Sequence, residues 1–195
     1  FFRKAACLIS IGSLICTAYL LLVKRVPPQN IVLVTFTRHA ARQMKERLAT
    51  IPGVTLAMVK QMITGTFHSL ARTIYFHKLD VSPRIMSEKQ KEFLIEQITK
   101  ELATGEQYEP ETLLALLAYL KNNLLLVGGT WAVEEVEGLK DDARRVLERY
   151  EAYKRDNHLI DYEDLITGCI ETLRAHPNYL IALRRRMAYI MVDEY

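Results

Sequence analysis

Short apolar runs alternate with amphipathic stretches in the first third of the chain. Residues 31–34 are apolar, mostly β-branched and follow the turn residues Pro27-Pro28-Gln29-Asn30, which predicts a strand buried on both faces. Apolar residues then recur at helical spacing over residues 38–49, with Thr37 at the N-cap position. A second strand within residues 54–66 leads into another helix. This alternation predicts an α/β layer with crossover connections.

The middle of the chain shows helical spacing only, from Ser87 to about residue 157. Ser87 and Gln90 are spaced as a capping box, and Pro110 is placed to begin a second, leucine-rich helix. The pair Gly128-Gly129 is expected to end that helix, and a third helix follows it. The pattern therefore predicts a helical insertion without strands.

After this block the pattern returns to helix and strand. Asp161 is placed to cap a helix, and residues 188–192 form an apolar run that predicts a buried strand. That strand delivers Asp193 and Glu194 at its carboxyl end. The expected organisation is one core made of two segments and one insertion between them: core 1–87 and 158–195, insertion 88–157.

Composition and cysteine usage restrict the class of protein only loosely. Half of the residues are apolar, 25% are charged and the net charge is +3, which is ordinary for a globular protein and permits contact with nucleic acid. Cys7, Cys16 and Cys169 are isolated from one another, so neither a zinc site nor a disulfide framework is expected. We therefore expect a reducing, cytoplasmic environment.

One long apolar stretch leaves two interpretations open. Residues 5–23 carry no charge and are flanked by Arg3-Lys4 and Lys24-Arg25. About 20 apolar residues can span a bilayer, so a membrane-anchored protein is one alternative. The basic residues at both ends give no orientation. A helix buried beneath the sheet is the other alternative.

The predicted strand ends carry side chains that suit phosphates, bases and metal ions. The turns Thr35-Phe36-Thr37-Arg38 and Thr66-Phe67-His68-Ser69 combine hydroxyls, a ring and a basic or imidazole group. Hydroxyls and helix N–H groups bind phosphate oxygens, and an aromatic ring can stack on an unpaired base. Asp193 could hold Mg²⁺ while Glu194 activates a water molecule, but the strand 188–192 and this pair alone are better explained as a solvated strand end. Either turn alone is better explained by core phenylalanines and capping threonines. Both turns side by side predict a platform for a single strand.

Four segments occur in a fixed order: residues 34–47, 65–70, 161–165 and 189–195. In that order, they resemble motif Ia, motif Ib, the Asp-Tyr-x-Asp-Leu stretch at which the chain re-enters the core domain, and motif II of UvrD/Rep/PcrA-type superfamily 1 DNA helicases. The agreement in order and spacing covers about residues 18–195. The resemblance implies an α/β fold with a RecA-like, P-loop-type parallel-sheet core (1A) and an inserted all-helical subdomain (1B). It also implies an ATP-driven motor that moves 3′ to 5′ on single-stranded DNA in replication or repair.

The resemblance assigns roles to individual residues. Asp193 would bind Mg²⁺, Glu194 would be the catalytic base, and the hydroxyl of Ser10 could reach the metal of a bound nucleotide. The implied cofactors are ATP and Mg²⁺. The implied partners are single-stranded DNA, or a single/double-strand junction, and a second RecA-like domain of the same motor. The implied DNA-contacting residues are Phe36, Thr37, Arg38, Thr66, Phe67, His68 and Ser69.

The phosphate-binding loop departs from the family pattern. No glycine in the chain is followed by lysine, and Leu8-Ile9-Ser10 stand where Gly-Lys-Thr belongs. Because the second domain and the later motifs are not in this sequence either, we expect that the chain alone does not hydrolyse ATP. We also expect residues 1–17 to be a replaced or misread segment. A module that only binds single-stranded DNA is therefore an alternative function. The membrane anchor is less favoured, because residues 18–21 keep the family register in a helix that lies beneath the sheet.

Overall fold

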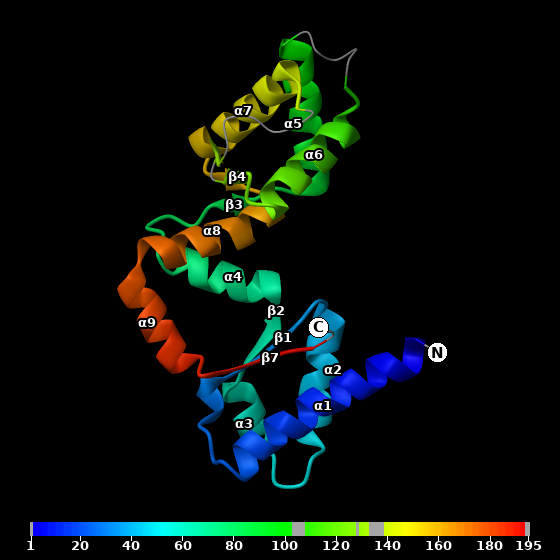
Figure 1. Ribbon diagram of the computed structural model, residues 1–195, viewed down its shortest axis with the longest axis vertical. Helices are drawn as coiled ribbons and strands as arrows, with labels where there is room; N and C mark the ends of the chain where they lie inside the picture. The colour runs from blue at the N-terminus through cyan, green and yellow to red at the C-terminus, as the bar shows by residue number, and fades with distance from the viewer. Residues whose placement is uncertain (1, 103–107, 128, 133–138, 194–195) are drawn as a thin grey trace. The chain divides into compact units, whose positions relative to one another are not determined.

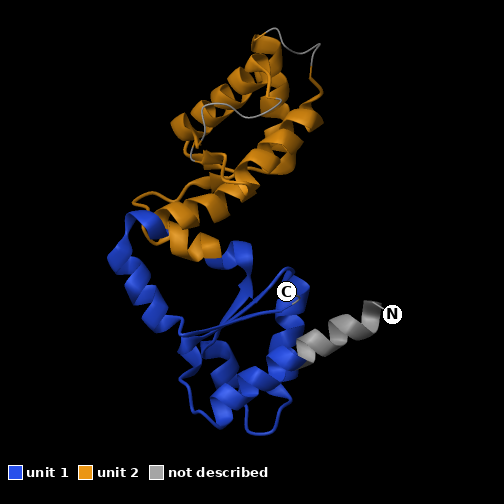
Figure 2. Cartoon of the chain, viewed as in Figure 1, with its two compact units in different colours: residues 1–70, 173–195 blue, residues 71–172 orange. Residues whose placement is uncertain are grey.

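The chain folds into two compact units in a computed structural model (Figures 1 and 2). Unit 1 comprises residues 1–70 and 173–195, and unit 2 comprises residues 71–172. The structure describes residues 12–102, 108–127, 129–132 and 139–193, and of residues 2–11 only that they belong to the first helix. The chain thus leaves unit 1 once and returns to it, as expected for an insertion.

The boundaries of the units differ from the predicted ones. Residues 71–87 and 158–172 group with the helical block rather than with the sheet. Short strands at the two ends of the block explain this, because β3 (Arg84–Ile85) pairs in parallel with β6 (Leu159–Ile160). The assignment of the two units to subdomains 1A and 1B remains a prediction.

Unit 1 is built around three parallel strands in the order β2-β1-β7. Every residue of the central strand β1 is buried, which confirms the predicted strand with two covered faces. Its register places Thr35 beside Thr66 and Val34 beside Val192. The elements are α1 (Phe2–Leu22), η1 (Pro28–Asn30), β1 (Ile31–Thr35), α2 (Arg38–Ala49), α3 (Leu56–Gln61), β2 (Ile63–Thr66), the start of α4 (Phe67–Phe76), α9 (Pro177–Arg186) and β7 (Tyr189–Val192).

The second half of α1 packs into the core of unit 1. Leu14, Ala18 and Leu21 belong to the same buried cluster as Leu33 of β1 and Met44 of α2. Since these side chains lie within a protein core, this part of the uncharged stretch occupies the place expected beneath the sheet. Over the residues that the structure describes, no helix is long and apolar enough to cross a membrane.

Three details of unit 1 correct the sequence prediction. Within the segment 54–66, only Ile63–Thr66 forms a strand, because the short helix α3 occupies the residues before it. Thr55 caps that helix, since its hydroxyl oxygen accepts a hydrogen bond from the backbone N–H of Met58 at 3.2 Å. Strand β7 is not fully buried. Ile190 is 59% exposed, because β7 has only β1 as a neighbour among the described strands. Helix α9 was not predicted. None of its residues is fully buried.

Unit 2 consists mainly of helices. Its capping box is confirmed, since the Ser87 backbone N–H donates to Gln90 Oε1 at 2.9 Å and the Gln90 N–H donates to Ser87 Oγ at 3.4 Å. Pro110 begins α6, as predicted. The elements are the rest of α4, β3, α5 (Glu88–Glu101), α6 (Pro110–Asn122), β4 (Leu126–Val127), β5 (Thr130–Trp131), α7 (Asp141–Asp156), β6 and α8 (Tyr162–Ala175).

The prediction of an insertion made only of helices is wrong in one place. Strands β4 and β5 form an antiparallel hairpin in which Val127 pairs with Thr130. Gly129 lies in the turn of that hairpin with a φ of 79°, a left-handed conformation that favours glycine. Gly129 therefore belongs to a β-turn, whereas α6 already ends at Asn122, and Gly128 lies outside the described residues.

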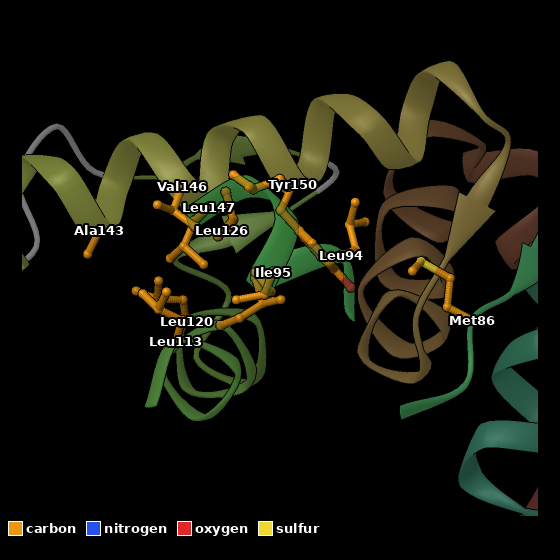
Figure 3. Close-up of a cluster of buried hydrophobic side chains, with 12 residues drawn as sticks. Met86, Leu94, Ile95, Leu113, Leu120, Leu126, Ala143, Val146, Leu147 and Tyr150 are labelled. Carbon is orange, nitrogen blue, oxygen red and sulfur yellow. The ribbon is translucent and has the colours of Figure 1, made fainter. Parts of the chain in front are cut away.

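The core of unit 2 lies between α5, α6 and α7 (Figure 3). Ile95 of α5, Leu120 of α6 and Leu147 of α7 are fully buried there, and the ring of Tyr150 extends through the same cluster. Leu126 of the β4–β5 hairpin also packs into this cluster. This apolar core holds the three helices together and sets the positions of the polar side chains at their ends.

Candidate nucleic-acid interface

The predicted strand ends lie along one edge of the sheet in unit 1. Because β1, β2 and β7 are parallel and in register, the residues that follow them emerge at the same side. The backbone N–H of Asp193 donates to the carbonyl of Val34 at 2.9 Å, which continues the β7–β1 pairing by one residue. The structure therefore brings together the ends of motif-like segments that are far apart in the sequence.

Hydroxyls organise the turn between β1 and α2. Thr35 is completely buried, and its hydroxyl donates to the carbonyl of Thr37 at 2.8 Å. Thr37 Oγ1 accepts a hydrogen bond from the N–H of Ala40 at 3.0 Å, which confirms Thr37 as the N-cap of α2. The cap fixes the start of the helix, so Arg38 is exposed at its first position.

The turn between β2 and α4 is closed by two side chains. Ser69 Oγ donates to the carbonyl of Thr66 at 2.8 Å and accepts from the N–H of Thr66 at 2.9 Å, while the N–H of Ser69 donates to Thr66 Oγ1 at 3.2 Å. Gly65 makes this possible, since a Cβ at that position would lie 2.4 Å from Ser69 Oγ. The sequence analysis missed Gly65, because the requirement arises from a hydroxyl later in the chain.

The two phenylalanines of these turns contact each other. The ring centroids of Phe36 and Phe67 lie 5.4 Å apart with an interplanar angle of 54°. Phe67 is half-buried, but Phe36 is 60% exposed. The alternative in which both rings are core residues therefore does not hold for Phe36. Its partner holds the ring in place and leaves part of it open to solvent.

A hollow of about 230 Å³ lies between α2 and the β2–α4 turn. We call it the basic hollow, because each charged side chain along its described walls is an arginine or a lysine. Arg38 belongs to the predicted site, whereas Arg42 and Lys45 were not singled out from the sequence. The lining residues are Arg38, Ala41, Arg42, Lys45, Gly65, Thr66 and Ser69.

Asp193 has the chemistry of a magnesium ligand. Its side chain is 2% exposed and lies at the carboxyl edge of the sheet. Carboxylate oxygens are preferred by Mg²⁺, which commonly takes one or two of them together with water and phosphate oxygens. The side chains of Ser10 and Glu194 lie outside the described residues, so their roles stay predictions. His68 is exposed on the first turn of α4.

Unit 2 holds a second group of charged side chains, and these are buried. We call it the buried ion cluster, and it consists of Lys121, Glu151, Lys154, Asp161 and Asp164. Lys121 Nζ lies 2.8 Å from Glu151 Oε1, 2.7 Å from Asp161 Oδ2 and 2.6 Å from Asp164 Oδ1. Lys154 Nζ lies 2.9, 2.8 and 2.5 Å from carboxylate oxygens of the same three residues.

The two aspartates of this cluster also begin α8. The N–H of Asp164 donates to Asp161 Oδ1 at 3.1 Å, and the N–H of Asp161 donates to Asp164 Oδ2 at 2.9 Å. The predicted cap at Asp161 is therefore confirmed. Burial alone would raise the pKa of Asp161, but the ammonium groups of Lys121 and Lys154 outweigh burial and lower the pKa below its usual range.

The buried ion cluster is closed to metal ions by its own lysines. Carboxylate oxygens of Glu151, Asp161 and Asp164 lie within 4.8 Å of one another, a spacing that could hold a cation. Both ammonium groups already contact these carboxylates. The cluster therefore joins α6, α7 and α8 and supports the fold of unit 2 rather than a ligand. Sequence reasoning missed Lys121 and Lys154, because neither stands near the aspartates in a recognisable motif.

Comparisons with known proteins show the family of the chain. Residues 15–195 match the family model described as the UvrD/REP helicase N-terminal domain. The chain is 32% identical over 179 residues to YjcD of Bacillus subtilis (strain 168), named as a candidate ATP-dependent DNA helicase, with 87% of this chain and 23% of the relative covered. It is 30% identical over 190 residues to the ATP-dependent DNA helicase PcrA of Staphylococcus aureus, with 91% and 25% covered. The chain thus spans about a quarter of the length of these relatives.

Proposed function

The chain belongs to the UvrD/REP helicase N-terminal domain family, and on that premise we propose that it forms part of an ATP-dependent helicase that moves along single-stranded DNA. The observation that carries the proposal is the exposed ring of Phe36, which Phe67 holds at the carboxyl edge of the sheet. An aromatic face at this edge suits an unpaired base.

The neighbouring groups support contact with a nucleic-acid backbone. Arg38 begins α2 two residues after Phe36, and the exposed His68 directly follows Phe67. Basic side chains beside a stacking ring combine attraction to phosphates with a surface for bases, which is the usual composition of sites for single strands. Thr37, Thr66 and Ser69 shape the two turns through their hydrogen bonds. We therefore assign these three residues to the same interface as positioning residues.

The ATP site is the second part of the proposal. Asp193 would hold Mg²⁺, Glu194 would orient or deprotonate the attacking water, and Ser10 would offer a hydroxyl to the metal. Bound Mg²⁺–ATP would supply the energy for movement, in the 3′ to 5′ direction that the resemblance implies. A second RecA-like domain would complete the nucleotide site. No Gly-Lys pair occurs in the sequence, so we expect these 195 residues alone to bind DNA without turning over ATP.

A module that binds single-stranded DNA without chemistry is the second candidate. The absent Gly-Lys pair favours it, since phosphate-binding loops supply a lysine charge that this chain does not offer at Leu8-Ile9-Ser10. Both candidates share the same DNA-binding surface. Turnover of ATP separates them, whereas DNA binding tests the premise on which both depend.

Replacement of Phe36 by alanine tests the shared surface. Stacking contributes roughly 1–3 kcal/mol per base, so Phe36→Ala should weaken binding of a labelled single-stranded oligonucleotide by about ten-fold or more. Fluorescence anisotropy measures the affinity. Phe93→Ala is the matched control, because Phe93 on α5 has the same 60% exposure but lies in unit 2. Equal losses in both variants, or none in either, would remove Phe36 from the interface.

A further inference from the structure

We propose that unit 1 carries a second interaction surface, at the amino edge of its sheet, which binds an acidic and partly apolar peptide segment of a partner protein. Phe36 and Asp193 lie at the carboxyl ends of the same strands, so this inference does not rest on the proposed function. We call it the amino-edge surface. Its exposed cations are Lys24, Arg25, Arg184, Arg185 and Arg186.

Parallel pairing brings these cations to one edge. Ile31, the first residue of β1, pairs with Tyr189, the first residue of β7. Lys24 and Arg25 precede η1 and β1, while residues 184–186 form the last turn of α9 just before β7. Helix α9 also packs against η1, and its lower end lies beside that segment in Figure 1. Both basic segments therefore lie near the amino ends of two neighbouring strands.

Unit 1 offers few acidic residues to these cations. None of the five forms an ion pair with a residue that the structure describes. The sequence of unit 1 has 13 lysines and arginines but three acidic residues, whereas unit 2 has 13 and 20. The three are Glu46, which pairs with Arg42, and Asp193 and Glu194, which follow β7. A dense group of cations without acidic partners attracts an anionic partner.

Arg25 occupies a backbone conformation that favours glycine. Its φ is 52°, in the left-handed region. The turn after α1 is held by backbone hydrogen bonds, since the N–H of Lys24 donates to the carbonyl of Tyr19 at 3.0 Å and the N–H of Val26 donates to the carbonyl of Leu20 at 2.9 Å. A glycine would end the helix there without strain. The arginine is therefore not required by the turn, and its charge is open to a partner.

Apolar side chains lie among the cations and indicate the kind of partner. Val23, Ile181 and Tyr189 are exposed. Val23 directly precedes Lys24, and Ile181 lies one turn before Arg184 on α9. Phosphates offer aliphatic side chains no apolar contact, whereas carboxylates pair with guanidinium groups through two parallel hydrogen bonds. A peptide that alternates carboxylates with apolar side chains therefore matches this surface better than a nucleic acid does.

A labelled synthetic peptide of repeated Glu-Glu-Leu units tests the proposal. Gln-Gln-Leu repeats, which lack the charge, and Glu-Glu-Ser repeats, which lack the apolar side chains, are the matched probes. Fluorescence anisotropy should show that the wild-type chain binds the Glu-Glu-Leu peptide about ten-fold more tightly than either matched probe, a difference of about 1.4 kcal/mol.

Two variants remove cations from the amino-edge surface. Arg184→Gln/Arg185→Gln/Arg186→Gln should weaken peptide binding by about ten-fold, because three exposed ion pairs are lost together. Arg25→Gly should weaken it by about two-fold. The thermal midpoint of Arg25→Gly should stay unchanged or rise, because glycine relieves the left-handed conformation. Both variants should keep the wild-type affinity for single-stranded DNA.

The triple variant Arg38→Gln/Arg42→Gln/Lys45→Gln is the matched control, because it removes three cations from the carboxyl side of the same unit. The five residues of β1 span roughly 13 Å at about 3.3 Å per step, whereas interactions between exposed charges fade over about 8 Å at physiological salt. The control should therefore keep the peptide affinity. Unaltered thermal unfolding confirms that the triple variants are folded, as expected for exposed positions.

The possible results separate this inference from the proposed function. Wild-type peptide affinity in both amino-edge variants overturns it, as does a larger loss in the control or equal binding of the Glu-Glu-Ser probe. Binding of duplex DNA or of phosphatidylserine vesicles that depends on residues 184–186, without binding of the peptide, assigns the surface to phosphates and also overturns it. Each of these results leaves the test of Phe36 with single-stranded DNA unaffected.

Discussion

The two units place their basic side chains in opposite environments. In unit 1, Arg38, Arg42 and Lys45 line an exposed hollow. In unit 2, Lys121 and Lys154 are 1% and 2% exposed and contact three carboxylates at hydrogen-bonding distance. A buried charge must be paired to be tolerated, whereas an exposed one remains available to a ligand. Burial and pairing, rather than residue type, therefore distinguish the charges that support the fold from those that remain available to a ligand.

Replacement of Lys121 should produce the largest effect. Lys121→Met leaves the carboxylates of Glu151, Asp161 and Asp164 with one ammonium group fewer, and breaking a buried pair in this way costs about 3–5 kcal/mol. Trp131, the one tryptophan of the chain, packs against the core of unit 2, so its fluorescence follows unfolding of that unit in urea.

Lys45→Met is the control for this experiment, because Lys45 is exposed in unit 1. Its stability change should stay within about 0.5 kcal/mol. If both variants unfold at the same urea concentration as the wild-type chain, the buried ion cluster does not stabilise unit 2 and the contrast between the units fails.

Gly65→Ala should have an intermediate effect. The added Cβ would lie 2.4 Å from Ser69 Oγ, so either this hydroxyl rotates away and loses its hydrogen bonds to Thr66 or the β2–α4 turn shifts, at a cost of about 1–3 kcal/mol. We expect lower thermal stability of unit 1 and weaker binding of single-stranded DNA. Removing the hydroxyl in the double variant Gly65→Ala/Ser69→Ala should relieve part of the clash. Full stability and full affinity in the single variant would contradict the tight turn.

Alkaline pH should weaken unit 2 by a smaller amount. Burial opposes the charge on Lys121, but the carboxylates outweigh it and raise its pKa well above the usual range; burial also raises the pKa of Tyr150. Groups with raised pKa values stabilise the folded state below their unfolded pKa, near 10, and lose that contribution as the pH rises through the folded pKa.

The expected loss is at most about 1.4 kcal/mol per group for each pH unit above that value. Urea unfolding at pH 8 and pH 11, followed by Trp131 fluorescence, measures it. The dependence should shrink in Lys121→Met. A stability of unit 2 that is constant, or that increases, between these pH values would argue against the assigned charges.

The elements that could be predicted are those whose signal is local. Strand β1 is a continuous buried run, and α2 begins at a threonine cap, so both were identified from adjacent residues. The gathering of Phe36, Phe67 and Asp193 at one edge followed from parallel strands in family order. The strand and the cap depend on adjacent residues, which is why the sequence alone indicates them, whereas the shared edge was inferred from the order of the motif-like segments.

The features that escaped prediction depend on partners distant in the chain. Strands β4 and β5 are too short to show alternation, and α9 has no buried face. The contacts of Lys121 reach across 40 and 43 residues to Asp161 and Asp164, so no spacing along one helix reveals them. The basic hollow likewise needs α2 and the β2–α4 turn to pack together before Arg42 and Lys45 share a space with Gly65.

Photochemical cross-linking tests most directly the claim that DNA lies along the carboxyl edge of the sheet in unit 1. The wild-type chain would be irradiated with a single-stranded oligonucleotide that carries 5-iododeoxyuridine, and the modified peptides would be identified by mass spectrometry. Stacked aromatic rings react readily with this base, so the account predicts adducts at Phe36 and Phe67, with fewer at either position in Phe36→Ala. Adducts confined to residues 71–172, with none in unit 1, would contradict it.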